Sequence, residues 1–144
     1  MVYLKKILAA IFTKPGYIKN MARLLIVDDA PFIREVIKHQ LQDTDVFVVG
    51  EAADGEEAVL RARDLQPDII LMDLVMPNCN GLDATRRIHQ DFPETRILAC
   101  STEASEEMVF EAMEAGCCDF IAKPFTSEQL LFALRGLMRR VANG

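Results

Sequence analysis

From Ala22 onward, short apolar runs alternate with longer stretches in which apolar and polar residues mix. The runs consist almost entirely of aliphatic and aromatic side chains, which is typical of strands buried on both faces of a sheet. Five such runs occur, at residues 24–27, 46–49, 69–72, 97–100 and 120–122. Because a helix-length stretch separates each run from the next, the pattern predicts parallel βαβ units.

The stretches between the runs carry apolar residues close to a 3.6-residue period, as amphipathic helices do. Pro31 suits the first turn of a helix, and Asp54 and Ser127 suit the N-cap position. Gly116 suits the residue that follows a helix. The predicted helices cover residues 31–43, a stretch after Asp54 that ends before Pro67, and residues 82–90, 108–115 and 127–141. We therefore expect an α/β protein with a doubly wound, five-stranded parallel sheet and five flanking helices.

Composition and charge exclude several classes of function. The chain has 144 residues, which fits a single domain, and a net charge of −6. General nucleic-acid binding is not expected, because it needs basic patches. Stable membrane insertion is not expected either, because no apolar run approaches the roughly 18 residues that a membrane span needs. The four cysteines show no C-x-x-C spacing, which indicates reduced thiols in a cytoplasmic protein rather than a zinc site.

Residues 1–20 differ from residues 21–144 in charge. They contain four lysines and no acidic residue, whereas the rest of the chain carries 12 basic and 22 acidic side chains. An apolar stripe at helical spacing runs along the segment and consists of Leu4, Ile7, Leu8, Ile11 and Phe12. The segment is predicted to be a basic amphipathic extension. Three interpretations stay open: an upstream extension from a misplaced start codon, a helix packed on the domain or on a partner, and contact with a membrane surface.

Polar side chains follow four of the five predicted strands. They are Asp28 and Asp29 after the first strand, Asp73 after the third, Ser101 and Thr102 after the fourth, and Lys123 after the fifth. In an open parallel sheet, ligands bind beyond the carboxyl ends of the strands. We therefore expect these side chains to converge at one edge of the sheet.

Three carboxylates at one edge repel one another unless a cation lies between them. Carboxylate oxygens suit Mg²⁺, which binds few protein carboxylates and takes phosphate oxygens as further ligands. Asp73 is then placed to attack phosphorus and form an aspartyl phosphate, while the metal and Lys123 stabilise the transferred charge. Ser101 can donate a hydrogen bond to a phosphoryl oxygen. The pattern predicts a Mg²⁺-dependent phosphoryl site.

The segments LLIVDDAPFIREVI, PDIILMDLVMPNCNG, ILACSTEAS and GCCDFIAKPFT occur in this order along the chain. In order and spacing they resemble a response-regulator receiver domain of the CheY type, over residues from about Met21 to Val141. The resemblance implies a flavodoxin-like fold with strand order 2-1-3-4-5. It also implies a signalling switch that is phosphorylated on an aspartate with Mg²⁺ as cofactor, and not an enzyme with a substrate of its own.

The resemblance assigns roles to the acidic residues. Asp73 matches the phosphorylated aspartate. Asp28 and Asp29 match the acidic pair that holds Mg²⁺, and Asp73 is also a metal ligand. Val75 matches the position whose backbone carbonyl completes the metal site. Val75 and Glu103 occupy positions that tune the attack of water on the phosphoaspartate, and an apolar Val75 predicts slow self-dephosphorylation.

The remaining roles concern phosphoryl binding and switching. Lys123 matches the lysine that pairs with the phosphoryl group, and the bond from Lys123 to Pro124 is expected to be cis. Ser101 matches the hydroxyl that moves toward this group, and Phe120 matches the aromatic residue that swings inward on activation. Thr102 stands where a small residue is usual, so it either narrows the approach to the phosphoryl group or offers it another hydroxyl.

The resemblance implies a sensor histidine kinase as phosphoryl donor and leaves two roles open. One is a stand-alone, chemotaxis-like adaptor that binds a target through its fourth helix, fifth strand and fifth helix, including Met108, Glu111 and Phe120. The other is a phosphorelay intermediate that passes its phosphoryl group to a histidine phosphotransfer protein. A phosphatase is disfavoured because Val75 stands where such enzymes carry a second acid. A flavodoxin-like cofactor binder is disfavoured because the two adjacent acids after the first strand repel a phosphate that lacks a metal.

Overall fold

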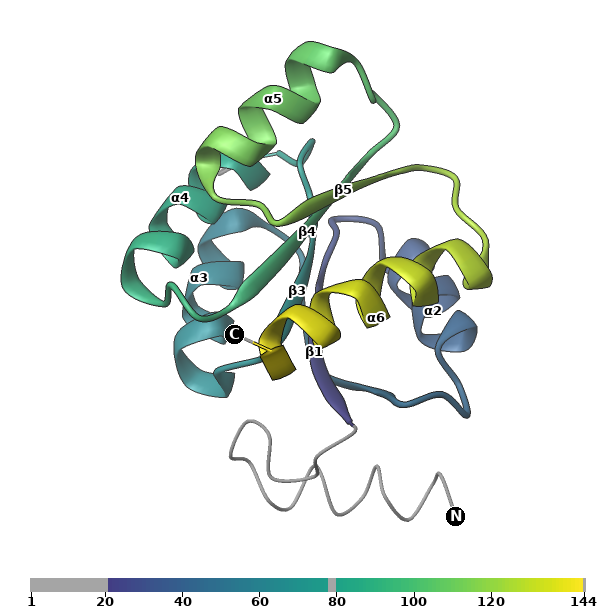
Figure 1. Cartoon of the computed structure of the whole chain (residues 1–144). Coiled ribbons are helices and arrows are strands. Elements are labelled where there is room, and N and C mark those ends of the chain that lie inside the picture. Colours follow the sequence, from purple (N-terminus) through teal and green to yellow (C-terminus); the bar gives the residue numbers. More distant parts are fainter. Residues whose placement is uncertain (1–20, 78–79, 144) are drawn as a thin grey trace.

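The computed structural model describes residues 21–77 and 80–143, which form a five-stranded sheet flanked by helices (Figure 1). Every neighbouring strand pair is parallel, in the order β2-β1-β3-β4-β5, so the predicted strand order is confirmed. The predicted extension at residues 1–20 and two residues of the predicted loop after Pro77 lie outside the described residues. The elements are β1 (Ala22–Val27), α2 (Pro31–Gln40), β2 (Val46–Ala52), α3 (Gly55–Leu65), β3 (Ile69–Asp73), α4 (Gly81–Asp91), β4 (Arg96–Ser101), α5 (Glu106–Ala115), β5 (Asp119–Ala122) and α6 (Ser127–Asn143).

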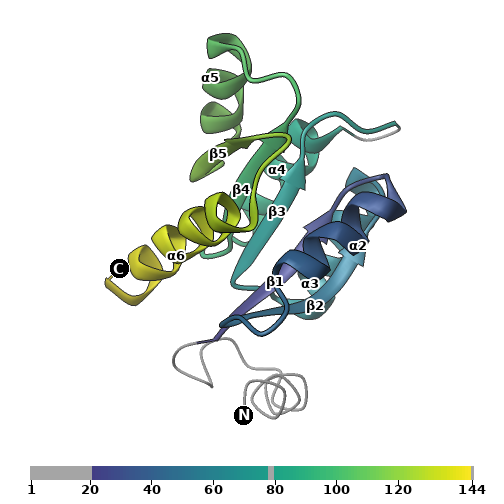
Figure 2. The ribbon, with the colours of Figure 1, turned by 90° about the vertical axis from the view of Figure 1, so that its right-hand side faces the viewer.

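The helices form two layers, one on each face of the sheet. Helices α3, α4 and α5 cover one face, and α2 and α6 cover the other and lie together on the near side in Figure 2. Successive residues of a strand point to opposite faces, so Leu25 and Val27 enter the first core while Leu24 and Ile26 enter the second. This arrangement confirms the predicted doubly wound α/β architecture.

The edge strands are less buried than the sequence suggested. Every residue of β1 and β3 is buried, as are all residues of β4 except Arg96. In β2 only Val46 and Ala52 are fully buried, and β5 contains no fully buried residue. The prediction that all five apolar runs are buried on both faces was therefore wrong for β2 and β5. These two strands pair with a neighbour on one side only, so solvent reaches them from the other side.

Side-chain caps set several helix boundaries. Asp54 caps α3 as predicted, because its Oδ1 accepts a hydrogen bond of 2.8 Å from the Glu57 N–H. Ser105 caps α5 through the Met108 N–H, so this helix begins at Glu106, two residues before the predicted start. The residue Gly116 follows α5 with a φ of 120°, a backbone conformation that favours glycine.

The predicted cap of the last helix was wrong. Ser127 is the first residue of α6, and Thr126 is the cap. The Thr126 hydroxyl accepts a hydrogen bond from the Gln129 N–H at 3.1 Å, and the Gln129 side-chain oxygen accepts one from the Thr126 N–H at 2.9 Å. This reciprocal pair is a capping box, which fixes the start of α6. Within the described part of the chain, none of the helices is both long and apolar enough to cross a bilayer.

Candidate functional site

The polar residues predicted from the strand ends converge at the carboxyl edge of the sheet. Asp28 directly follows β1, and Asp73 is the last residue of β3. Asp73 lies opposite Cys100 in the neighbouring strand, and Ser101 lies opposite Ala122. Lys123 comes next along the chain after Ala122, so the register of three parallel strands brings its side chain to the two carboxylates.

Lys123 joins the two buried carboxylates. Its Nζ lies 2.6 Å from Asp28 Oδ2 and 3.4 Å from Asp73 Oδ2. Both acids are almost inaccessible to solvent, with Asp28 2% and Asp73 5% exposed, whereas Asp29 is exposed. The three carboxylates place one oxygen each within 4.8 Å of one another. The site therefore has two buried acids, one acid open to solvent and a single ammonium group.

Backbone amides orient the inner carboxylates. The Ala30 N–H donates to Asp28 Oδ1 at 2.9 Å, and the Val75 N–H donates to Asp73 Oδ1 at 3.2 Å. In each carboxylate the other oxygen, Oδ2, faces Lys123. The turn after each strand thus orients the acid at the end of that strand. The side chain of Val75 itself points away from the core, because the residue is 57% exposed.

Burial and charge shift the protonation of this cluster. Burial raises the pKa of Asp73 above its ordinary value, and the negative charge of Asp28 raises it further, although Lys123 and the Val75 N–H oppose the shift. Burial alone would lower the pKa of Lys123, but its hydrogen bond to Asp28 and the surrounding negative charge raise that pKa instead. Lys123 is therefore a firmly protonated ammonium between two acids, and one negative charge of that pair is not neutralised.

This donor set fits a hard divalent cation. With all three acids ionised, the carboxylates carry three negative charges against the one positive charge of Lys123, which leaves the two that a divalent cation would neutralise. The donors are all carboxylate oxygens, which Mg²⁺ prefers over nitrogen or sulfur ligands. Two of the three carboxylates are held in place by backbone hydrogen bonds, and the exposed Asp29 keeps one side of the cluster open to solvent.

Ser101 and the residues near it differ in their exposure to solvent and in their contacts. Ser101 is 1% exposed, and its Oγ accepts a hydrogen bond of 3.0 Å from the Glu103 N–H. Thr102 and Glu103 are exposed. In the described ranges, no hydrogen bond joins the side chain of Ser101 or Thr102 to the acids. Phe120 is half-buried and packs against the core beneath α3, α4 and α5. The bond from Lys123 to Pro124 is cis, as predicted.

Arg34 supports the acidic site, and the sequence did not reveal it. Its Nη1 donates to the backbone carbonyl of Asp28 at 2.6 Å, and its Nε donates to Glu51 Oε1 at 2.9 Å. The guanidinium group therefore ties the turn after β1 to the end of β2. An arginine inside an amphipathic helix has no sequence feature that marks it for this role, because the contact depends on how α2 sits against the sheet.

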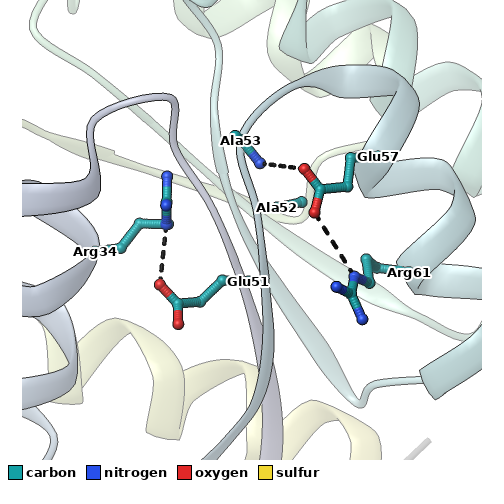
Figure 3. A pocket seen from close by; sticks show the side chains of 6 residues that line it. All are labelled: Arg34, Glu51, Ala52, Ala53, Glu57 and Arg61. Carbon is teal, nitrogen blue, oxygen red and sulfur yellow. Dashed lines mark hydrogen bonds and ion pairs between the residues drawn. The ribbon is translucent and has the colours of Figure 1, made fainter.

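Arg34 also lines a polar cleft of about 230 Å³ beside the site. Figure 3 shows its lining, in which the charged side chains form two ion pairs, one on each side of the end of β2. Arg34 bonds Glu51, and Arg61 lies 3.7 Å from Glu57. A second oxygen of Glu57 accepts from the Ala53 N–H. Each charged side chain that lines the cleft therefore has a partner of opposite sign, and Glu57 also holds the start of the loop between β2 and α3.

Comparison with known proteins gives consistent matches. A model of the response regulator receiver domain matches residues 24–135. The chemotaxis protein CheY of Thermotoga maritima is 44% identical over 112 residues, covering 78% of this chain and 93% of that protein. The response regulator domain of T. maritima CheB has a TM-score of 0.73 at 39% identity, covering 86% of this chain and 98% of that one.

A complex described as CheX-CheY-BeF3-Mg²⁺ from Borrelia burgdorferi gives a TM-score of 0.77 at 26% identity, covering 81% of this chain and 88% of that one. The structural matches agree with the observed fold, a five-stranded parallel sheet flanked by helices. This chain belongs to the family of response regulator receiver domains.

Proposed function

We propose that this response regulator is switched by Mg²⁺-dependent phosphorylation of Asp73 and then binds a protein target. The observation that carries the proposal is the contact of Lys123 with Asp28 and Asp73 at the carboxyl edge of the sheet. A partly buried ammonium beside a buried carboxylate is suited to a reaction that adds negative charge at that carboxylate. The exposed Asp29 leaves the cluster open on the side from which a phosphodonor approaches.

The proposed reaction transfers a phosphoryl group from a phosphohistidine of a sensor kinase. A carboxylate oxygen of Asp73 attacks phosphorus, the P–N bond breaks, and the histidine nitrogen leaves with its electron pair and takes up a proton. Asp28, Asp29, Asp73 and the backbone carbonyl of Val75 would hold Mg²⁺, which when bound neutralises charge on the phosphoryl oxygens. Lys123 donates a hydrogen bond to the transferred group, and Asp73 keeps the amide contact from Val75 that orients it.

Ser101 is proposed to convert phosphorylation into a change of shape. In this proposal its hydroxyl turns and donates to a phosphoryl oxygen on Asp73, and its contact with the Glu103 N–H is lost. The exposed segment at residues 102–105 leads into α5, so loss of that contact frees this segment to move. Thr102 would offer a further hydroxyl, and Phe120 would turn further into the core. The phosphoryl group would thus shift an existing equilibrium between two conformations.

The proposed output surface combines α5, β5 and α6. Met108, Glu111 and Phe120 are half-buried there, so a shift of Phe120 changes what a partner meets. The CheY relatives carry chemotaxis names, which supports a chemotaxis-like adaptor in the cytoplasm. A phosphorelay intermediate would use the same acids and pass the group to a histidine phosphotransfer protein. Loss of label from the phosphorylated chain to such a protein would favour that second role.

Metal removal tests the proposed chemistry. Incubation with acetyl phosphate and Mg²⁺ should give a phosphorylated chain in which hydroxylamine cleaves the phosphoryl bond, as expected for an acyl phosphate. Excess EDTA should reduce the labelled fraction to background, because three acids and one lysine cannot neutralise the incoming phosphoryl charge without the cation. Intact-protein mass spectrometry measures the labelled fraction. Equal labelling with Mg²⁺ and with EDTA would exclude the proposed mechanism.

Val75→Asn should shorten the lifetime of the phosphorylated state severalfold. The apolar side chain of Val75 lies in solvent next to Asp73 and cannot orient a water molecule, whereas an amide can hold one for attack on phosphorus. The half-life of the acyl phosphate, measured by mass spectrometry in the presence of Mg²⁺, checks the prediction. Leu60→Asn is the control, because Leu60 is 50% exposed on α3, away from the acids. An unchanged or longer half-life in Val75→Asn would refute the prediction.

A further inference from the structure

The outer surface of α5 combines exposed apolar and acidic side chains. Phe110 is 64% and Met113 is 45% exposed, and they lie three residues apart, on one face of the helix. Glu106, Glu107 and Glu114 lie three or four residues from Phe110 and are also exposed. We call these five residues the acidic α5 face. It has the composition of a docking surface for a segment that is both apolar and basic.

The charge of the acidic α5 face is not compensated within the described ranges. Among the described residues, 21–77 and 80–143, no ion pair involves a glutamate of α5. The last turn of the helix has no basic residue, and Glu114 stands there, where the helix dipole disfavours negative charge. A basic partner would therefore stabilise this helix as well as cover its apolar residues.

The other exposed apolar side chains on the described helices lie among charges of both signs, since Glu35 lies on α2, Glu57 on α3 and Glu128 on α6 together with basic residues. Phe32 and Val36 share α2 with Arg34 and Lys38. Phe132, which is 76% exposed on α6, lies three residues before Arg135. A basic segment would meet some like charges on these surfaces but none on α5, which contains no basic residue, so it favours the acidic α5 face.

The chain itself contains a segment of the complementary kind. Residues 4–12 carry the apolar stripe together with Lys5 and Lys6, and the whole of residues 1–20 has no acidic residue. The stripe has the spacing that lays one apolar face against another helix, with lysines beside it that can reach glutamates. The segment therefore offers the positive charges that the glutamates of the acidic α5 face lack, and apolar side chains that can cover Phe110 and Met113.

The chain is long enough for this contact. Met21 begins next to β1, and α5 ends shortly before β5, so both lie at the edge of the sheet where the parallel strands start. The strands β3 and β4 separate β1 from β5, which puts the two strand starts about 14 Å apart at about 4.8 Å per strand. The eight residues 13–20 span up to about 26 Å when extended. The segment can therefore reach α5 of its own chain.

We propose that residues 4–12 dock as a helix on the acidic α5 face of the same chain, with the apolar stripe over Phe110 and Met113. Lys5 and Lys6 pair with the glutamates of that face. The docking rests only on these charges and apolar contacts. Its regulatory consequence rests on the proposed function: the segment occupies part of the output surface and competes with a target for it.

A single tryptophan provides the test, because the chain contains none. In the full-length chain with Phe12→Trp, the indole is expected to be shielded from acrylamide and to emit at a shorter wavelength than free tryptophan. Adding Phe110→Ser should raise the acrylamide quenching constant roughly twofold or more and shift the emission to the red, since the apolar contact is lost. The matched control is Phe132→Ser, which removes another exposed phenylalanine, 76% exposed on α6, and should change neither quantity.

Charge reversal tests the ionic part independently. Glu107→Lys with Glu114→Lys should raise quenching as Phe110→Ser does, and adding Lys5→Glu and Lys6→Glu to that protein should restore the shielding. Salt at about 0.5 M should raise the quenching constant of the Phe12→Trp protein, because salt screens the exposed charges that hold the segment. The measurements need neither Mg²⁺ nor phosphorylation, so their failure and the failure of the proposed switch are distinguishable.

Three outcomes would overturn the docking. One is a tryptophan that is quenched by acrylamide as strongly in the Phe12→Trp protein as in the same protein with Phe110→Ser. Another is shielding that appears only with added vesicles containing phosphatidylserine, which would assign the segment to a membrane surface. The third is shielding that disappears on dilution, which would place the segment on a second copy of the chain.

Discussion

Asp73→Asn is expected to abolish labelling by acetyl phosphate while leaving the fold intact. The amide has the shape of the carboxylate but is not a nucleophile toward phosphorus, so no acyl phosphate can form. Lys123 keeps its shorter contact, the one to Asp28, and is not left as an unpaired buried charge. Mass spectrometry after incubation with acetyl phosphate and Mg²⁺ should show only the unmodified chain.

The raised pKa of Asp73 predicts that this substitution does not destabilise the protein. A carboxyl whose pKa is raised on folding contributes stability that is complete below its ordinary pKa and is lost as the pH rises through the raised value. At neutral pH the ionised Asp73 therefore disfavours the folded state, and a neutral amide removes that penalty. The midpoint of thermal unfolding should stay unchanged or rise.

Asp91→Asn is the control for this substitution, because Asp91 is exposed at the end of α4, away from the acids. It should be labelled like the parent protein. If Asp73→Asn still acquires a hydroxylamine-sensitive phosphoryl group, another residue is the acceptor. If Asp73→Asn unfolds, its loss of labelling does not identify the acceptor. The stability of the fold would then depend on the contact between Lys123 and Asp73 more than its length of 3.4 Å indicates.

Gly81→Ala is expected to destabilise the domain by about 3 kcal/mol or more, the range of severe steric substitutions. A Cβ at this position would overlap the backbone carbonyl of Asp73 and would lie 2.7 Å from Leu74 Cα. Both neighbours are backbone atoms, so no side chain can rotate away. The start of α4 would have to move, together with the hydrogen bond from the Gly81 N–H to the Leu74 carbonyl. Urea denaturation followed by circular dichroism measures the loss.

Gly136→Ala provides the opposite result with the same chemical change. Gly136 lies inside α6, and an added Cβ there would meet nothing within 4 Å. Alanine should stabilise the domain by about 0.5–1 kcal/mol, because glycine loses more conformational freedom in a helix. A loss of stability in Gly136→Ala, or a Gly81→Ala protein as stable as the parent, would contradict this account of the two glycines.

Much of the fold followed from patterns that are local in sequence. Apolar runs of strand length gave the strands, and turn residues such as Asp54 and Gly116 marked their helix ends correctly. The degree of burial of β2 and β5 did not follow, because it depends on a strand's place in the sheet. The cap of α6 was assigned one residue too late, since Thr126 and Ser127 are both good cap residues and only the bond to Gln129 distinguishes them.

The candidate site was predictable where the chemistry sits at strand ends. Parallel strands place their carboxyl ends together, so Asp28, Asp73 and Lys123 were expected to meet, and the distances show that they do. The supporting contacts were not predictable. Arg34 reaches the Asp28 carbonyl only because of where α2 lies against the sheet, and the close approach of Gly81 to Asp73 depends on where α4 begins.

The strand order has a consequence for how phosphorylation can reach the surface that a target would bind. Asp73 lies on the central strand β3, and the path to the proposed output surface runs sideways through β4 to the open edge at β5. The strands β1 and β2 lie on the opposite side of Asp73 and take no part in that path. Under the proposed function, the phosphoryl site and the output surface therefore meet at Lys123, which directly follows β5 and contacts Asp73, so the effect of phosphorylation has only one neighbouring strand to cross before it reaches that edge.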